Sequence, residues 1–238
     1  MSITLALLVA ALVWGYKMTP TAVPCAALEY NIEDGAERMY LSEGELNQLL
    51  RAEKVYPVGQ PLDAGSLYRI ERTVKSHPMV RTAECYTTPR NEVRVRLTQR
   101  VPLLRVQRPD ESFFIDTDRR AMQVRPSVRD SVLLVTGAVG MQMATRQLAD
   151  FAEWLQTDSY WHNRIHHVFV QSPQMVVLCL KGNQPRVKMG PMRDYERKLA
   201  KLRVFLENGA EAIQDKHYTE LDIRFRGQVI GRGNEPQQ

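Results

Sequence analysis

The sequence has few of the residues that mark several protein classes. Only 13 Gly and 13 Pro occur in 238 residues, which excludes collagen-like and low-complexity chains. The three cysteines, Cys25, Cys85 and Cys179, are too few and too irregularly spaced for a complete disulfide framework or a C-x-x-C metal site. We expect them to be small buried apolar residues. The excess of positive over negative charge is also small. The net charge of +5 is too weak to predict nucleic-acid binding.

The composition predicts a folded chain of one to two domains, with 44% hydrophobic and 25% charged residues. Residues 3–14 carry no charge and are followed by Tyr16 and Lys17, which suit a membrane interface. We expect an uncleaved membrane anchor over residues 1–18. Its apolar run reaches about 18 to 24 Å as a helix, which is short for a bilayer core of about 30 Å. A cleaved signal peptide and a buried core helix are the alternatives.

Residues 19–102 predict a linker and a small domain with the order β-α-α-β-β. A strand over residues 27–32 is followed by a helix that starts at a capping box of Ser42 and Glu45. A second helix begins near Asp63 or Ser66 and ends before His77-Pro78. Strands over residues 79–87 and 91–101 complete the domain, the second with apolar and polar residues in alternation.

Residues 103–238 predict a β-rich domain of mixed strands with two helices, so that the whole chain is α+β. The helices are expected over residues 147–156 and from about 192 to 208, and strands over residues 165–170 and 175–180. Two further strands close the chain. In the first, Leu221, Ile223 and Phe225 alternate with polar residues, and the second runs from Val229 to Gly231.

Nothing in the sequence favours an enzyme, because it contains no nucleophile elbow, phosphate loop or dinucleotide-binding loop. His162, His166 and His167 resemble a metal cluster only in spacing. The pattern predicts a strand there, which sends His166 and His167 to opposite faces. Asp116 and Asp118 form a D-x-D pair, but the hairpin context favours Asp as a turn former. We expect no metal and no cofactor.

Several segments resemble one protein family. The β-α-α-β-β order resembles the POTRA module. The run from His77-Pro78 through Val80 and Ala83 to Arg100, Pro102 and Leu103 resembles the bacterial cell-division family FtsQ/DivIB, although Gln99 stands where that family usually has Glu. Phe114 to Arg120 and the segment from Leu221 continue the likeness. The resemblance implies a single-pass protein of the bacterial inner membrane at the division septum. Its body would be periplasmic, and it would act as a scaffold without a small-molecule substrate or nucleic acid.

The same resemblance implies that the last strand receives the small coiled-coil division protein FtsB, with FtsL and other divisome proteins as further partners. Strand addition to a sheet edge is the expected mode. The matching residues are Phe225, Arg226, Gly227, Gln228, Val229, Ile230, Gly231 and Arg232. Arg224, Arg226 and Arg232 are expected to point outward, and Gly231 to permit close backbone approach.

A basic helix face is a possible secondary partner contact; its residues are Arg193, Arg197, Lys198 and Lys201. Such a face is more commonly only solvated. Two other functions remain open from the sequence. One is a POTRA-type chaperone for outer-membrane proteins, and the other is an anchored metal-dependent enzyme that uses the D-x-D pair or the histidines.

Overall fold

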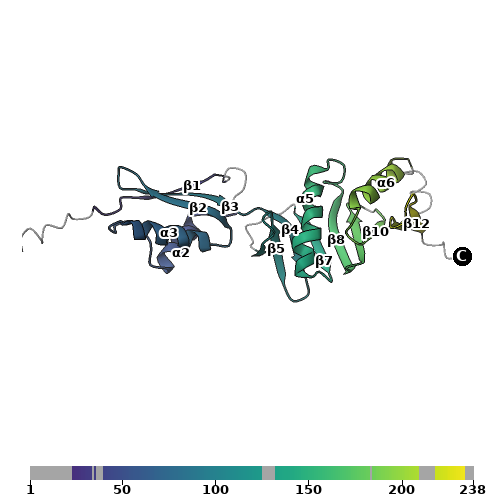
Figure 1. The fold of residues 1–238 in the computed structure, drawn as a ribbon, viewed down its shortest axis with the longest axis horizontal. Coiled ribbons are helices and arrows are strands. Elements are labelled where there is room, and N and C mark those ends of the chain that lie inside the picture. Colours follow the sequence, from purple (N-terminus) through teal and green to yellow (C-terminus); the bar gives the residue numbers. More distant parts are fainter. Residues whose placement is uncertain are drawn as a thin grey trace, which may run out of the picture. The chain divides into compact units, whose positions relative to one another are not determined.

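The structure is a computed structural model, which describes residues 23–33, 35, 40–124, 132–182, 184–208 and 218–233. The expected anchor over residues 1–18 lies outside these ranges. Within them, every helix is too short or too polar to cross a membrane. The chain divides into two compact units, one that ends at Gln99 and one that begins at Arg100 (Figure 1).

The first unit is a three-stranded sheet with two helices on one face (Figure 1). Its elements are β1 (Leu28–Ile32), α2 (Glu43–Ala52), α3 (Ala64–Ser76), β2 (Val80–Thr87) and β3 (Val93–Gln99). The strand order is β1-β3-β2, with β1 parallel and β2 antiparallel to β3. The β-α-α-β-β order predicted from the sequence is confirmed.

Local signals explain the two helices of this unit. Ser42 and Glu45 form the predicted capping box at the start of α2, and Leu46 and Leu50 of that helix are fully buried. Asp63 caps α3 through the backbone N–H of Ser66. The helices therefore begin where their caps predict, and their apolar faces pack on the sheet.

The third strand is shorter than expected. It ends at Gln99 instead of residue 101, because Arg100 and Val101 connect the units and Pro102 already begins a strand of the other sheet. The predicted alternation in β3 is confirmed, since Val93 and Val95 are buried while Arg94 is exposed.

The second unit is built on a nine-stranded mixed sheet. Its strands are β4 (Pro102–Gln107), β5 (Ser112–Asp116), β6 (Ala121–Gln123), β7 (Leu133–Gly137), β8 (Ile165–Ser172), β9 (Met175–Leu180), β10 (Arg186–Gly190), β11 (Tyr218–Asp222) and β12 (Ile230–Gly233). They lie in the order β12-β11-β10-β9-β8-β7-β4-β5-β6. Among the residues that the structure describes, β12 and β6 are therefore the edges of the sheet.

The helices of the second unit differ from the prediction at their starts. The first runs from α4 (Met141–Met143) through a π-helical turn, η1 (Ala144–Leu148), into α5 (Ala149–Thr157), so it begins six residues before residue 147. The second, α6, covers Tyr195–Asn208 and begins after residue 192, because Asp194 has φ +53 and breaks the helical path. Leu148 and Leu155 of the first helix, and Leu199 of α6, are buried as predicted.

Candidate functional site

The last strand, β12, lies at the edge of the large sheet (Figure 1). It pairs antiparallel with β11, with Ile230 opposite Asp222, Gly231 opposite Leu221 and Arg232 opposite Glu220. In the described part of the chain no strand pairs with its other side. Alternate N–H and C=O groups of β12 therefore point away from the sheet, as they do along any edge strand.

The segment predicted as a strand is divided in the structure. The first of the two final strands, β11, ends at Asp222, so the apolar alternation through Ile223 and Phe225 does not continue as a strand. Residues 223–229 form a loop, in which Gly227 has φ +73. The predicted segment from Phe225 to Arg232 thus combines this loop with β12.

Gly231 has a different role from the one expected. A Cβ atom at Gly231 would lie 2.4 Å from Cε1 of Tyr218 and 2.7 Å from its Cζ, so the tyrosine ring of β11 fills the space beside the glycine. The close approach that Gly231 permits is therefore made by the chain's own Tyr218. An aromatic ring over a strand glycine is a known way to protect such a position.

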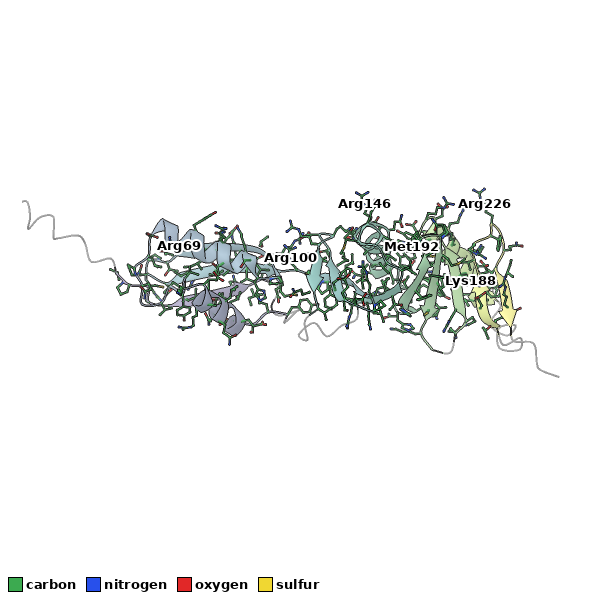
Figure 2. All side chains as sticks on the ribbon, turned by 90° about the horizontal axis from the view of Figure 1, so that it is seen from below. Arg69, Arg100, Arg146, Lys188, Met192 and Arg226 are labelled. Carbon is green, nitrogen blue, oxygen red and sulfur yellow. The ribbon has the colours of Figure 1, made fainter. Side chains whose placement is uncertain are left out.

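The loop of residues 223–229 and helix α6 enclose a cavity of about 310 Å³. Its lining comes from both predicted sets, the basic helix face and the final segment. The lining residues are Arg197, Lys198, Lys201, Ile223, Arg224, Phe225, Arg226 and Gly227, which we call the basic pocket. Figure 2 shows Arg226 at the periphery of the second unit. Arg193 lies before α6 and does not line the cavity.

Lys201 holds the loop against α6. Its ammonium group donates to the backbone carbonyl of Ile223 at 3.1 Å and to that of Phe225. Burial lowers the pKa of Lys201, and the nearby Arg197 lowers it further. Lys198 donates to the carbonyl of Pro191 at 2.9 Å, and burial lowers its pKa as well. Sequence spacing predicts a basic face here but not which of its lysines bind their own chain.

Asp222 and Arg224 form an ion pair that the sequence prediction missed. The Asp222 side chain is 1% exposed and receives Arg224 Nε at 2.9 Å and Nη2 at 2.6 Å, a bidentate arrangement. Burial by itself raises the pKa of Asp222, but the hydrogen bonds from Arg224 outweigh it, and the pKa is lowered. The only sign of this ion pair in the sequence is the position of Asp222, a carboxylate between the apolar residues Leu221 and Ile223.

The basic pocket keeps a positive charge. No acidic side chain is among the described residues that line it, and the buried Asp222 beside it is neutralised by Arg224. Arg197, which lies 3.6 Å from the exposed Asp194, remains largely in solvent. Phe225 adds an apolar wall and is 45% exposed. The pocket thus suits an acidic side chain of another chain, placed just before or after a segment of that chain that pairs with β12.

His167 and Asp116, one from each candidate set, have structural roles. His166 and His167 point to opposite faces of β8, and His167 Nε2 lies 2.8 Å from Thr136 Oγ1. Asp116 accepts the N–H of Arg120 at 2.7 Å, as predicted for a turn former. Across the described ranges no group of three or more His, Cys, Asp or Glu side chains could hold a metal ion.

Two family models match the chain. One, described as a POTRA-like domain, matches residues 23–98, and the other, described as FtsQ/DivIB, C-terminal related, matches residues 101–232. No match was found among curated proteins. The second model covers more than half of the chain, and both families are in general non-enzymatic scaffolds. The chain therefore belongs to the FtsQ/DivIB-related family and is a division-related scaffold with a POTRA-like domain.

Proposed function

We propose that this protein binds a coiled-coil division partner of the FtsB type, together with FtsL, by strand addition to β12. The observation that carries the proposal is the position of β12 at the sheet edge, next to the basic pocket. The backbone groups of β12 supply hydrogen bonds for an added strand, and side chains beside the strand supply selectivity. The scaffold links early and late division proteins in this way and carries out no chemistry itself.

The partner segment is expected to be extended and acidic. Arg226 and Arg197 remain accessible in the basic pocket, whereas Lys201 and Arg224 are already bound to this chain. A carboxylate of the partner that enters the pocket gains charge-assisted hydrogen bonds. The charge complementarity fixes the register of the added strand, because a shift by one residue sends the carboxylate to the other face.

The proposed location is the bacterial inner membrane at the division septum. Residues 1–18 would anchor the chain there, and the two described units would lie in the periplasm. The family membership supports a role in division, and the apolar run of residues 3–14 supports the anchor.

Proline substitutions test the strand-addition mechanism. Successive residues of an extended strand direct their N–H groups to alternate sides, so Ile230 and Gly233, three residues apart in β12, donate to opposite sides. One of Ile230→Pro and Gly233→Pro therefore removes a donor on the open side of β12. We expect that variant to lose capture of FtsB from membranes while its circular dichroism stays unchanged. Ile230→Thr and Gly233→Ala, which keep the N–H, are the matched controls. Normal capture by both proline variants, or capture of an outer-membrane barrel protein in place of FtsB, would refute the mechanism.

A charge reversal in the same assay tests the basic pocket. Arg226→Glu places a negative charge in the cavity and should weaken capture at least about tenfold, the equivalent of one lost charge-assisted contact. Arg193→Glu makes the same change of net charge outside the cavity and should bind like the parent chain. Equal losses in both variants would show that only the overall charge matters.

A further inference from the structure

A second basic cavity, of about 690 Å³, lies in the first unit. It is enclosed by the end of α2, the segment of residues 55–61 and the first turns of α3. Three cationic side chains line it, Arg51, Lys54 and Arg69, together with the ring of Tyr56. None of the described residues in its lining is acidic. We call it the α2–α3 pocket.

The chain's own residues neutralise the cationic side chains of this pocket only in part. The Arg51 guanidinium lies 3.7 Å from the centroid of the Tyr56 ring, which orients it without neutralising it. Neither Arg51 nor Lys54 forms an ion pair with a residue that the structure describes. Arg69 donates to Ser66 Oγ at 3.1 Å and lies 3.8 Å from Asp63, a contact between exposed groups. The pocket therefore has unused capacity for an anion.

The acidic residue that contacts Arg69, Asp63, also has another role. Asp63 accepts hydrogen bonds from the backbone N–H and the hydroxyl of Ser66, and so caps α3. Hydrogen bonds from Ser66, first from its hydroxyl and then from its backbone, lower the pKa of Asp63. The backbone N–H of Ser66 is thus satisfied by this cap, and an anion in the pocket would be bound by the three cationic side chains.

The wall of the pocket is fixed to the first described residues of the chain. Cys25 donates to the carbonyl of Gln60 at 2.8 Å, and Gly59 donates to the carbonyl of Cys25 at 2.9 Å. Pro24 and Pro61 form an isolated bridge next to them. Five Cα–Cα steps separate residue 18 from residue 23, which limits the distance between them to about 18 Å. An anchor that ends at residue 18 therefore keeps this pocket close to the lipid headgroups.

We infer that the α2–α3 pocket binds the phosphodiester headgroup of an anionic phospholipid. Arg51 and Arg69 present planar guanidinium groups that match phosphate oxygens in pairs, and Lys54 adds a compact charge. Basic side chains close to an anionic membrane surface are attracted to it. This inference rests on the membrane anchoring proposed above, and it assigns the first unit a surface that orients it on the bilayer.

The test uses the full chain in bilayer nanodiscs of phosphatidylcholine, with or without phosphatidylglycerol. Hydrogen exchange is measured at the backbone amides of residues 53–60. Phosphatidylglycerol should slow their exchange at least about fivefold, because a ligand that binds only the folded state suppresses local opening. In Arg51→Gln/Lys54→Gln/Arg69→Gln the two bilayers should give equal exchange. Arg72→Gln/Lys75→Gln/Arg90→Gln, which removes three charges from other places in the same unit, should behave like the parent chain.

Each other outcome overturns the inference. Equal exchange of the parent chain in the two bilayers excludes a headgroup site, and this comparison needs no variant. Inorganic phosphate that gives the same protection in nanodiscs of phosphatidylcholine alone identifies a free-phosphate site. Protection lost equally in both triple variants shows only a net-charge effect. A chain that fails to enter nanodiscs refutes the anchor and, with it, this inference. Capture of FtsB by the variant Arg51→Gln/Lys54→Gln/Arg69→Gln tests strand addition to β12 separately.

Discussion

At the scale of single residues, the buried carboxylate of Asp222 sets the path of the final loop. Its two oxygens receive Arg224, whose backbone N–H also donates to Oδ1 at 3.1 Å. Asp222→Asn removes the charge of this pair and should lower the free energy of unfolding of the second unit by roughly 1 to 3 kcal/mol. Thermal or urea denaturation measures the change. Asp194→Asn, which alters an exposed ion pair, should cost less than about 1 kcal/mol.

The pH dependence of this pair follows from the lowered pKa of Asp222. The stability that the pair contributes is fully present above the ordinary carboxyl pKa of 3.8 and is lost as the pH falls through the lower pKa of the folded state. The difference in free energy of unfolding between the parent chain and Asp222→Asn should therefore be constant at about pH 6 and become smaller below about pH 4. A difference that widens in acid would contradict the assignment of the pair.

At the scale of elements, the final hairpin depends on the contact between Tyr218 and Gly231. Gly231→Ala places a methyl group 2.4 Å from Tyr218 Cε1 and should destabilise the β11–β12 pairing by roughly 1 to 3 kcal/mol. Hydrogen exchange of the β12 amides should then be faster. Tyr218→Ser in the same chain removes the ring and should restore part of the protection, a coupling between neighbouring sites. Additive losses in the double variant would show that the ring is not the cause.

Elements with local signals could be predicted from the sequence, and those with distant partners could not. The capping box of Ser42 and the alternation of β3 are encoded within a few residues, so their elements were expected. The end of β11 is different. The alternation through Phe225 favours a strand, but Lys201 of α6 takes the carbonyls of Ile223 and Phe225 and holds them in a loop. No nearby residue in the sequence reports that contact.

The same limit applies to the candidate site. The basic residues of α6 and the final segment were both identified from the sequence, but as separate features. Their meeting in one cavity depends on the burial of α6 in the core of the second unit, where Lys201 reaches the carbonyl of Ile223 in the loop. Arg193 belongs to the same charge pattern and lies outside the cavity because α6 begins only at Tyr195.

At the scale of the whole molecule, the two units have separate hydrophobic cores. Leu46 and Val74 belong to one, and Leu199 and Val168 to the other. Leu46→Ala should lower the unfolding free energy of the first unit alone by about 3 kcal/mol, and Leu199→Ala that of the second. Scanning calorimetry should show two transitions, each shifted by one variant. A single transition that both variants shift would contradict independent units.

The pairing of β1 with β3 determines how the first unit responds to a pulling force. These two strands are neighbours and run parallel over five residue pairs, from Leu28 opposite Val93 to Ile32 opposite Leu97. The chain enters at the start of β1 and leaves toward the second unit at the end of β3. Tension applied at these two points pulls the strands in opposite directions along their length, so it loads the hydrogen bonds of the pair together in shear instead of opening them one by one. The first unit should therefore resist mechanical unfolding when it is pulled at these two points.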